Sequence, residues 1–108
     1  MKRGQTWTAA GTGYASKARP VVIVQDDRFD ATDSVVVCLL TSDPTDAPLI
    51  RVPVEPSDTN GLQQPTRIMV DKLVTVRRSA LGKHLGRLGD EDMVRVGRAL
   101  VVFLGLAG

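Results

Sequence analysis

The sequence contains one cysteine and one histidine, so it lacks the residues that most metal sites and many catalytic sites use. The single cysteine, Cys38, excludes an internal disulfide, and no cysteines and histidines stand at the spacing of a zinc site. Cys38 lies among valines and leucines, as a small buried hydrophobe would, whereas His84 lies in a segment rich in leucine and glycine. Ser–His–Asp and Cys–His catalysis are therefore not indicated. We expect a reduced protein without a structural metal or a cofactor.

Long hydrophobic runs are also missing. The longest apolar runs, such as residues 99–104, are too short to span a bilayer. Residues 5–8 are too polar for the apolar core of a signal peptide, although Lys2 and Arg3 precede them. With 43% hydrophobic and 24% charged residues, the 108-residue chain has the composition of a globular protein. We expect one domain, residues 1–108, located in the cytoplasm and not bound to a membrane.

The net charge is only +2, but the charges are unevenly distributed. Residues 1–25 carry four basic residues and no acidic one, and residues 67–87 carry six basic residues and one acidic one. Between them, residues 26–33 carry four aspartates and one arginine. If the two basic segments meet in the fold, they form a surface that neutralises phosphates, which would favour nucleic acid as a partner. The alternative is a set of solvated loop charges.

Short β-branched runs bounded by turn residues predict a small, mainly antiparallel β-protein. The predicted strands cover residues 5–10, 21–24, 35–40, 49–54 and 68–76. The fourth should lie near a sheet edge, because Pro48 and Pro53 cannot donate to a ladder. The fifth is either two strands or one bent strand, with Asp71 and Lys72 at the bend. Trp7 of the first strand is expected to face the core.

The C-terminal part of the chain predicts the one convincing helix. Residues 79–88 fit a helical turn followed by a short strand. Asp90 is expected to cap the helix that follows, and acidic residues in the first turn match the helix dipole. Residues 93–104 place a broad apolar face on that helix, which we expect to pack against a sheet and to end at Gly105. Five to seven strands closed by such a helix predict a partly open barrel.

Three polar features stand at the predicted ends or bend of strands, where a rigid element holds a side chain that still reaches solvent. They are Arg19-Pro20, Thr41-Ser42 and Asp71-Lys72. Taken singly, each is also explained as an ordinary surface charge or turn residue.

These features are part of a longer series of motifs in a fixed order. The series is Arg3-Gly4-Gln5-x-Trp7, Arg19-Pro20-Val21-Val22-Ile23-Val24, the run 35–40 followed by Thr41-Ser42, Gly61-Leu62 ahead of Val70-Asp71, Leu81-Gly82-x-x-Leu85-Gly86-x-Leu88, and Asp90-Glu91-Asp92-Met93. In this order and at nearly these spacings, the motifs resemble the MazF/PemK family of toxin endoribonucleases. The resemblance extends over residues 3–106.

The resemblance implies an SH3-like barrel with a C-terminal helix, a homodimer, and a site in a groove that spans the dimer. It implies sequence-specific, metal-independent cleavage of single-stranded RNA, chiefly messenger and sometimes ribosomal or transfer RNA, which would inhibit translation and growth. The products would be a 2′,3′-cyclic phosphate and a 5′-hydroxyl. A cognate antitoxin would neutralise the toxin by laying a disordered segment across the same groove.

By the same resemblance, the expected catalytic residues are Arg19 and Thr41. Arginine suits bidentate stabilisation of phosphate, so Arg19 is expected to hold the phosphate and is a candidate general acid, while the general base is left open. Thr41 is expected to donate a hydrogen bond to the scissile phosphate. The expected RNA contacts are Tyr14, Lys17, Ser42, Asp71, Lys72 and Arg77.

The chain departs from the family pattern at several positions. The loop before Arg19 is short and lacks the acidic residue that many members place there. Lys72 stands where glutamine is usual, and Met69 stands where some members have an arginine. The RNA sequence that other members cleave is therefore not transferable to this chain.

Two other functions are compatible with the same fold. The related CcdB-type toxins share the barrel and the dimer but poison DNA gyrase through a tryptophan-containing C-terminal end. Here the chain ends Leu106-Ala107-Gly108. The second alternative is a barrel that binds RNA without cleaving it.

Overall fold

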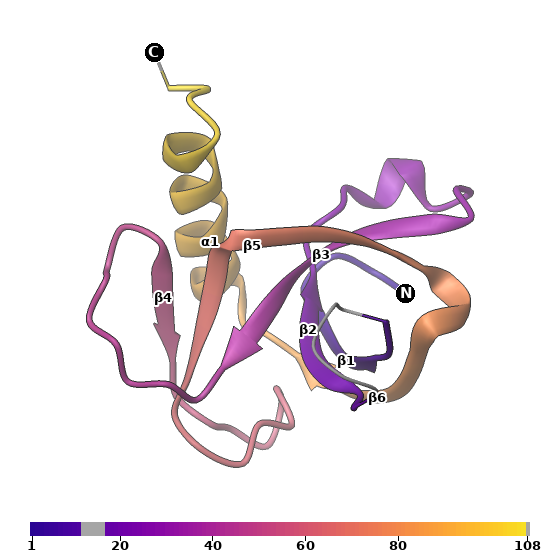
Figure 1. The fold of residues 1–108 in the computed structure, drawn as a ribbon, viewed down its shortest axis with the longest axis horizontal. Coiled ribbons are helices and arrows are strands. Elements are labelled where there is room, and N and C mark those ends of the chain that lie inside the picture. Colours follow the sequence, from indigo (N-terminus) through magenta and orange to yellow (C-terminus); the bar gives the residue numbers. More distant parts are fainter. Residues whose placement is uncertain (12–16, 108) are drawn as a thin grey trace.

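The β-branched runs form the centre of a curled antiparallel sheet in the computed structural model, which describes residues 1–11 and 17–107 (Figure 1). The elements in chain order are β1 (Gln5–Ala9), β2 (Arg19–Ile23), the 3-10 turn η1 (Asp27–Phe29), β3 (Ser34–Thr41), β4 (Arg51–Val54), β5 (Thr66–Arg77), the 3-10 turn η2 (Arg78–Ala80), β6 (Leu81–Arg87) and α1 (Asp90–Phe103). The six strands pair in the order β4-β5-β3-β2-β1-β6. The predicted fold class is confirmed, and β4 lies at the sheet edge, as its prolines predict.

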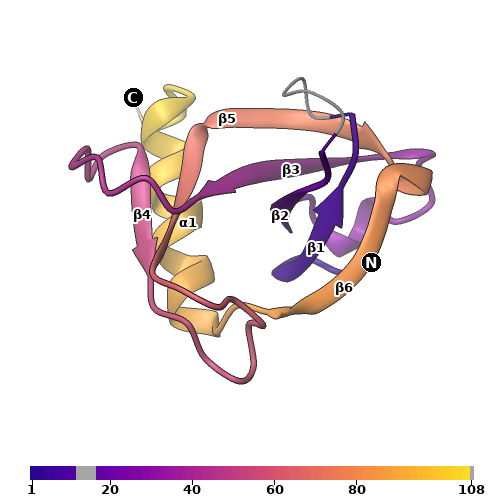
Figure 2. The same cartoon turned by 60° about the horizontal axis from the view of Figure 1, so that its bottom comes forward.

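Both faces of the central strands β2 and β3 are buried, because the sheet curls around one face and α1 covers part of the other (Figure 2). Val22 and Ile68 point to the cluster that includes Val96 of α1. Their chain neighbours Val21 and Met69 point to the barrel interior, against which Trp7 also packs. The absence of polar alternation in the central runs therefore has a structural cause, since a strand covered on both faces has no solvent side.

A loop closes the barrel beside β6. The Arg87 amide donates to the Thr59 carbonyl at 2.9 Å, and the buried Thr6 hydroxyl donates to the Asn60 carbonyl at 2.9 Å. The approach is close enough to require glycine: a Cβ on Gly86 would lie 2.2 Å from the Thr59 carbonyl oxygen. Gly61 has a φ of +68°, and its Cβ would lie 2.0 Å from the Leu85 carbonyl oxygen.

Strand β5 is one bent strand and not two. Cys38 pairs with Leu73, and the next residue of β3, Leu39, pairs with Met69, so residues 70–72 have no pairing partner in β3. The Val70 amide instead donates to the Ile50 carbonyl at 3.0 Å. Figure 2 shows the resulting bend of β5 near α1. Asp71 and Lys72 lie at this bend, as expected.

The helix differs from the prediction in two respects. Its N-cap is Gly89 without a side-chain cap, and Asp90 is the first helical residue, so the prediction that Asp90 caps the helix is wrong. The second difference concerns burial, because only one stripe of the predicted apolar face reaches the sheet. Val96 is fully buried, whereas Val94, Val101, Val102, Phe103 and Leu104 are 39 to 59% exposed. The helix ends at Phe103 and turns at Gly105, close to the predicted end.

No helix among residues 1–11 and 17–107 is long and apolar enough to cross a membrane.

Candidate functional site

The antiparallel ladder between β2 and β3 brings Arg19, at the start of β2, next to Thr41, at the end of β3. Val21 pairs with Leu39, and Arg19 and Thr41 lie two residues beyond that pair at the ends of their strands. Both line a cavity of about 300 Å³. The cavity is completed by Leu39, Leu40, Asp43, Arg51, Met69 and Lys72. The fold therefore joins three of the residues predicted from the sequence, Arg19, Thr41 and Lys72.

The Thr41 hydroxyl is held by the turn that follows β3. Its oxygen accepts a hydrogen bond from the Asp43 amide at 3.1 Å. The Asp43 carboxylate accepts from the Thr45 hydroxyl at 2.8 Å and from the Thr45 amide at 3.1 Å, and these bonds lower the pKa of Asp43. This bond uses one lone pair of the Thr41 oxygen and leaves the hydroxyl proton available for donation to another group.

Arg51 lines the same cavity and was missed by the sequence analysis. Its Nε and Nη2 donate to the two carboxylate oxygens of Asp71, each at 2.9 Å. The side chains are 18% and 19% exposed. The hydrogen bonds from Arg51 are the main cause of the lowered pKa of Asp71, and the charges of Arg51 and Lys72 add to it. Arg51 pairs with Met69 across the β4–β5 ladder, a register that the sequence does not reveal.

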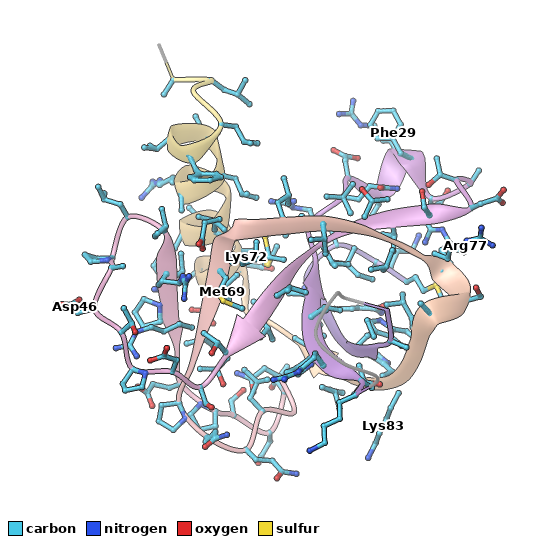
Figure 3. All side chains as sticks on the ribbon, viewed as in Figure 1. Phe29, Asp46, Met69, Lys72, Arg77 and Lys83 are labelled. Atoms are coloured by element: carbon cyan, nitrogen blue, oxygen red, sulfur yellow. The ribbon has the colours of Figure 1, made fainter. Side chains whose placement is uncertain are left out.

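The cavity combines an apolar floor with a charged rim. Leu39 and Leu40 are buried, and Met69 packs against the cluster inside the barrel. Arg19, Arg51 and Lys72 carry positive charge, and Asp43 and Asp71 carry negative charge. Figure 3 shows Met69 and Lys72 near the bend of β5. Such a site fits a ligand with one flat apolar part and one anionic part.

The remaining residues expected to bind RNA are placed differently. Ser42 follows Thr41 and is exposed, and Lys17 is exposed two residues before Arg19. Arg77 lies at the far end of β5, paired with Ser34, and lines a separate cavity of about 350 Å³ with Gly11 (Figure 3). Tyr14 lies outside the described residues.

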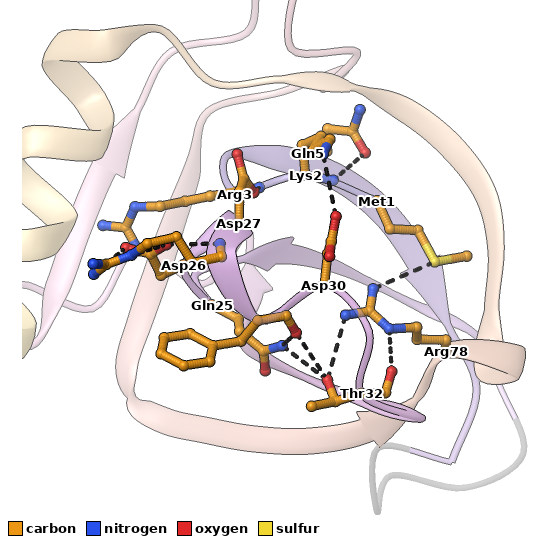
Figure 4. A network of polar contacts seen from close by, with 12 residues as sticks. Met1, Lys2, Arg3, Gln5, Gln25, Asp26, Asp27, Asp30, Thr32 and Arg78 are labelled. Atoms are coloured by element: carbon orange, nitrogen blue, oxygen red, sulfur yellow. Dashed lines mark hydrogen bonds and ion pairs between the residues drawn. The ribbon is translucent and has the colours of Figure 1, made fainter.

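The basic residues Lys2 and Arg3 do not line the cavity, and their side chains contact other parts of the chain (Figure 4). The Arg3 amide donates to the Asp27 carboxylate at 2.7 Å, and its guanidinium donates to the Val24 carbonyl. The Lys2 ammonium lies 3.5 Å from the Asp30 carboxylate. Of the N-terminal basic segment, only Arg19 lines the cavity that also holds Lys72 of the second segment.

Cys38 is buried, as the sequence analysis expected, whereas His84 lies on the surface. Cys38 is fully buried, and desolvation raises the pKa of its thiol to about 12. His84 is exposed and stacks on Trp7 with ring centroids 4.8 Å apart. In the part of the chain that the structure describes, no three His, Cys, Asp or Glu side chains gather closely enough to hold a metal ion.

A second, larger hollow of about 730 Å³ lies on the exposed apolar face of α1. Met93, Val94, Gly97, Val101 and Val102 supply most of its lining, and Arg3 and Arg98 are also among the lining residues.

Known proteins resemble this chain in both sequence and fold. The family described as "PemK-like, MazF-like toxin of type II toxin-antitoxin system" matches residues 2–104. A probable endoribonuclease MazF of Mycolicibacterium smegmatis is 54% identical over 109 residues, covering the whole of both chains. Among solved structures, a mycobacterial endoribonuclease in complex with its cognate antitoxin has a TM-score of 0.82 at 31% identity, covering 98% of this chain and 96% of that one. A MazE–MazF structure from Deinococcus radiodurans shares the fold, with a TM-score of 0.77 at 19% identity over 97% and 95% of the chains. The protein with the Arg19–Thr41 cavity therefore belongs to the PemK/MazF family of toxins of type II toxin–antitoxin systems.

Proposed function

We propose that this chain is an endoribonuclease toxin of the MazF type that cleaves single-stranded RNA in the Arg19–Thr41 cavity. The observation that carries the proposal is the meeting of a guanidinium and a hydroxyl donor at neighbouring strand ends, above an apolar floor, in a MazF fold. Its place of action is the cytoplasm, where single-stranded messenger RNA is available. Cleavage at short sequences would inhibit translation and growth.

The reaction is a transesterification within the RNA backbone. The 2′-oxygen attacks the adjacent phosphorus, the bond between phosphorus and O2′ forms, and the bond between phosphorus and O5′ breaks. The products are a 2′,3′-cyclic phosphate and a 5′-hydroxyl. Catalysis needs removal of the 2′-hydroxyl proton, delivery of a proton to O5′, and stabilisation of the charge on the phosphorane.

Arg19 is the proposed anion-binding residue. A guanidinium can donate two parallel hydrogen bonds to the non-bridging oxygens of a phosphate. The departing 5′-alkoxide is a much stronger base than a neutral guanidine, so Arg19 is also the proposed proton donor to O5′.

Thr41 is the proposed second donor to the phosphorane. Its oxygen accepts from the Asp43 amide, which holds the oxygen in place and leaves its proton available, and the Asp43–Thr45 hydrogen bonds hold the turn. A donor fixed before the reaction stabilises developing charge without reorganisation. Asp43 and Asp71 have lowered pKa values and are weak proton acceptors, so we assign the general base to neither.

We propose that the protein acts as a homodimer through the exposed face of α1. An apolar patch on a helix of a globular protein indicates a partner. This face carries a hollow lined by Gly97 and Val101, and its exposed side chains include Val94 and Val102, so it offers apolar surface that a two-fold symmetric contact would bury.

A cognate antitoxin is the proposed protein partner, because the mycobacterial endoribonuclease with TM-score 0.82 was solved with one. We propose that a disordered, acidic antitoxin segment occupies the Arg19–Thr41 cavity and excludes RNA. The cationic rim favours an acidic peptide for the same reason that it favours a phosphate.

Incubation of the purified protein with a long single-stranded RNA in EDTA, followed by mapping of the ends, tests the activity. Arg19→Ala and Thr41→Val should lose cleavage, whereas Arg28→Met, on the exposed turn η1, should cut like the parent. RNA binding without cleavage by the parent would contradict the proposal and favour a non-catalytic barrel. Growth arrest that a gyrase mutation relieves would favour the gyrase poison.

A further inference from the structure

Arg51 lines the same cavity as Arg19 but lies on a different strand of the sheet. Between β4, which carries Arg51, and β2, which carries Arg19, lie β5 and β3. Three strand spacings amount to about 14 Å measured along the curled sheet. The intervening floor consists of Met69 and Leu39, which are paired across the ladder. A phosphate bound at Arg19 would therefore leave the adjacent base above this apolar floor, with one edge toward Arg51.

The Arg51–Asp71 pair is better suited to a base than to a phosphate. Both carboxylate oxygens of Asp71 accept from Arg51, so the pair carries no net charge and attracts an anion less than Arg19 or Lys72 does. Arg51 lines the cavity while it makes its two hydrogen bonds to Asp71. The ion pair also fixes the plane of the guanidinium, which gives its hydrogen bonds a direction.

We propose that Arg51 determines the cleavage sequence by donating hydrogen bonds to the base next to the scissile phosphate, and that Asp71 is the residue that positions it. The inference rests on the proposed cleavage in the Arg19–Thr41 cavity. The base is one that presents acceptors to a donor, such as guanine through O6 and N7 or a pyrimidine through O2. Adenine presents an N6 donor beside N7 and is disfavoured.

This assignment changes the role of Asp71, which the sequence analysis expected to contact RNA. With both oxygens accepting from Arg51, Asp71 acts on the substrate through the orientation of that guanidinium. A direct contact and an indirect one are separable, because an indirect contribution disappears when Arg51 is removed.

The test is the cleavage profile on a long RNA of mixed sequence, with every cut mapped and its initial rate measured. Arg51→Lys keeps the positive charge but removes the planar group that can donate two parallel hydrogen bonds. The preference for one base at one nucleotide position should therefore fall by roughly 5- to 150-fold, the range for one bidentate contact to a base. Arg28→Lys is the matched control, because Arg28 makes a similar two-point pair with Asp26 on an exposed turn. Its profile should equal that of the parent.

A double-mutant cycle tests the positioning role. Asp71→Asn should weaken the base preference at the same nucleotide position when Arg51 is present. In an Arg51→Met background, it should have no further effect on that preference. The double variant Arg51→Met/Asp71→Asn carries neither charge and preserves volume, so it should fold even if Arg51→Met alone does not. Circular dichroism and thermal unfolding confirm folding for each variant.

The outcomes are distinguishable. If the variants lower the rate at all sites equally and leave the profile unchanged, Arg51 does not read a base and the inference is overturned. If Asp71→Asn acts equally with and without Arg51, its contact with RNA is direct and the positioning role is overturned. A parent protein that cuts no RNA overturns the proposed function itself, and the inference with it.

Discussion

Replacement of Gly86 by alanine should open the barrel. The new Cβ would lie 2.2 Å from the Thr59 carbonyl oxygen and 2.7 Å from the Asn60 carbonyl carbon, and both are backbone atoms. The segment at Thr59 and Asn60 must move away, which breaks the hydrogen bond to the Arg87 amide and the one from the buried Thr6 hydroxyl. Two lost hydrogen bonds and one buried hydroxyl left without a partner cost about 3 kcal/mol together.

Urea unfolding followed by Trp7 fluorescence measures this loss, because Trp7 lies on β1 and stacks on His84 of β6. For a domain of this size, about 3 kcal/mol corresponds to a fall in Tm of roughly 12 to 24 °C. Gly89→Ala is the control, since no atom lies within 4 Å of its added Cβ, and it should change stability by less than about 1 kcal/mol. If Gly86→Ala is as stable as Gly89→Ala, the loop does not close the barrel as argued.

Three further predictions concern the site, the helix face and the titratable groups. Thr41→Val should lower kcat by about 10²- to 10³-fold, the usual cost of one donor to the transition state, and Thr41→Ser should restore most of it. Val101→Glu should halve the mass measured by light scattering at micromolar concentration, whereas Glu91→Lys should not; an unchanged mass for Val101→Glu would exclude this face as the dimer contact. Asp71 has a folded pKa below its unfolded value, so its contribution to stability is complete above the unfolded pKa, near 4, and is lost as pH falls through the folded pKa. Tm should therefore fall less between pH 5 and pH 2 in Asp71→Asn than in the parent, and parallel curves would contradict the ion-pair argument.

The sequence predicts the elements whose signals are local. β-branched runs identify the central strands, and the apolar period identifies α1, because each depends on neighbours within one element. The N-cap was misassigned, since the extended conformation of Gly89 decides it and not the chemistry of Asp90. The barrel closure was not foreseen, because Gly86 and Asn60 are far apart in sequence and their contact depends on the curl of the whole sheet.

The site residues divide in the same way, into those with a local sequence signal and those placed by contacts between distant segments. Arg19 and Thr41 were predicted because each stands beside a recognisable strand and their order matches the family. Arg51 was missed, because its place on the cavity wall depends on the register that sets it opposite Met69. The local charge count also misled for Lys2, whose basic group lies against Asp30 of the acidic segment. A single sequence does not show which distant segments pair.

The pairing of β1 with β6 has a consequence for synthesis of the protein. Gln5 pairs with Arg87, so the first strand to be made finds one of its two partners only when the last strand is available. A nascent chain that stops short of β6 has no closed barrel and leaves one edge of β1 unpaired. Translation through β6 must therefore precede a closed barrel, and a chain that stops before β6 cannot complete the sheet.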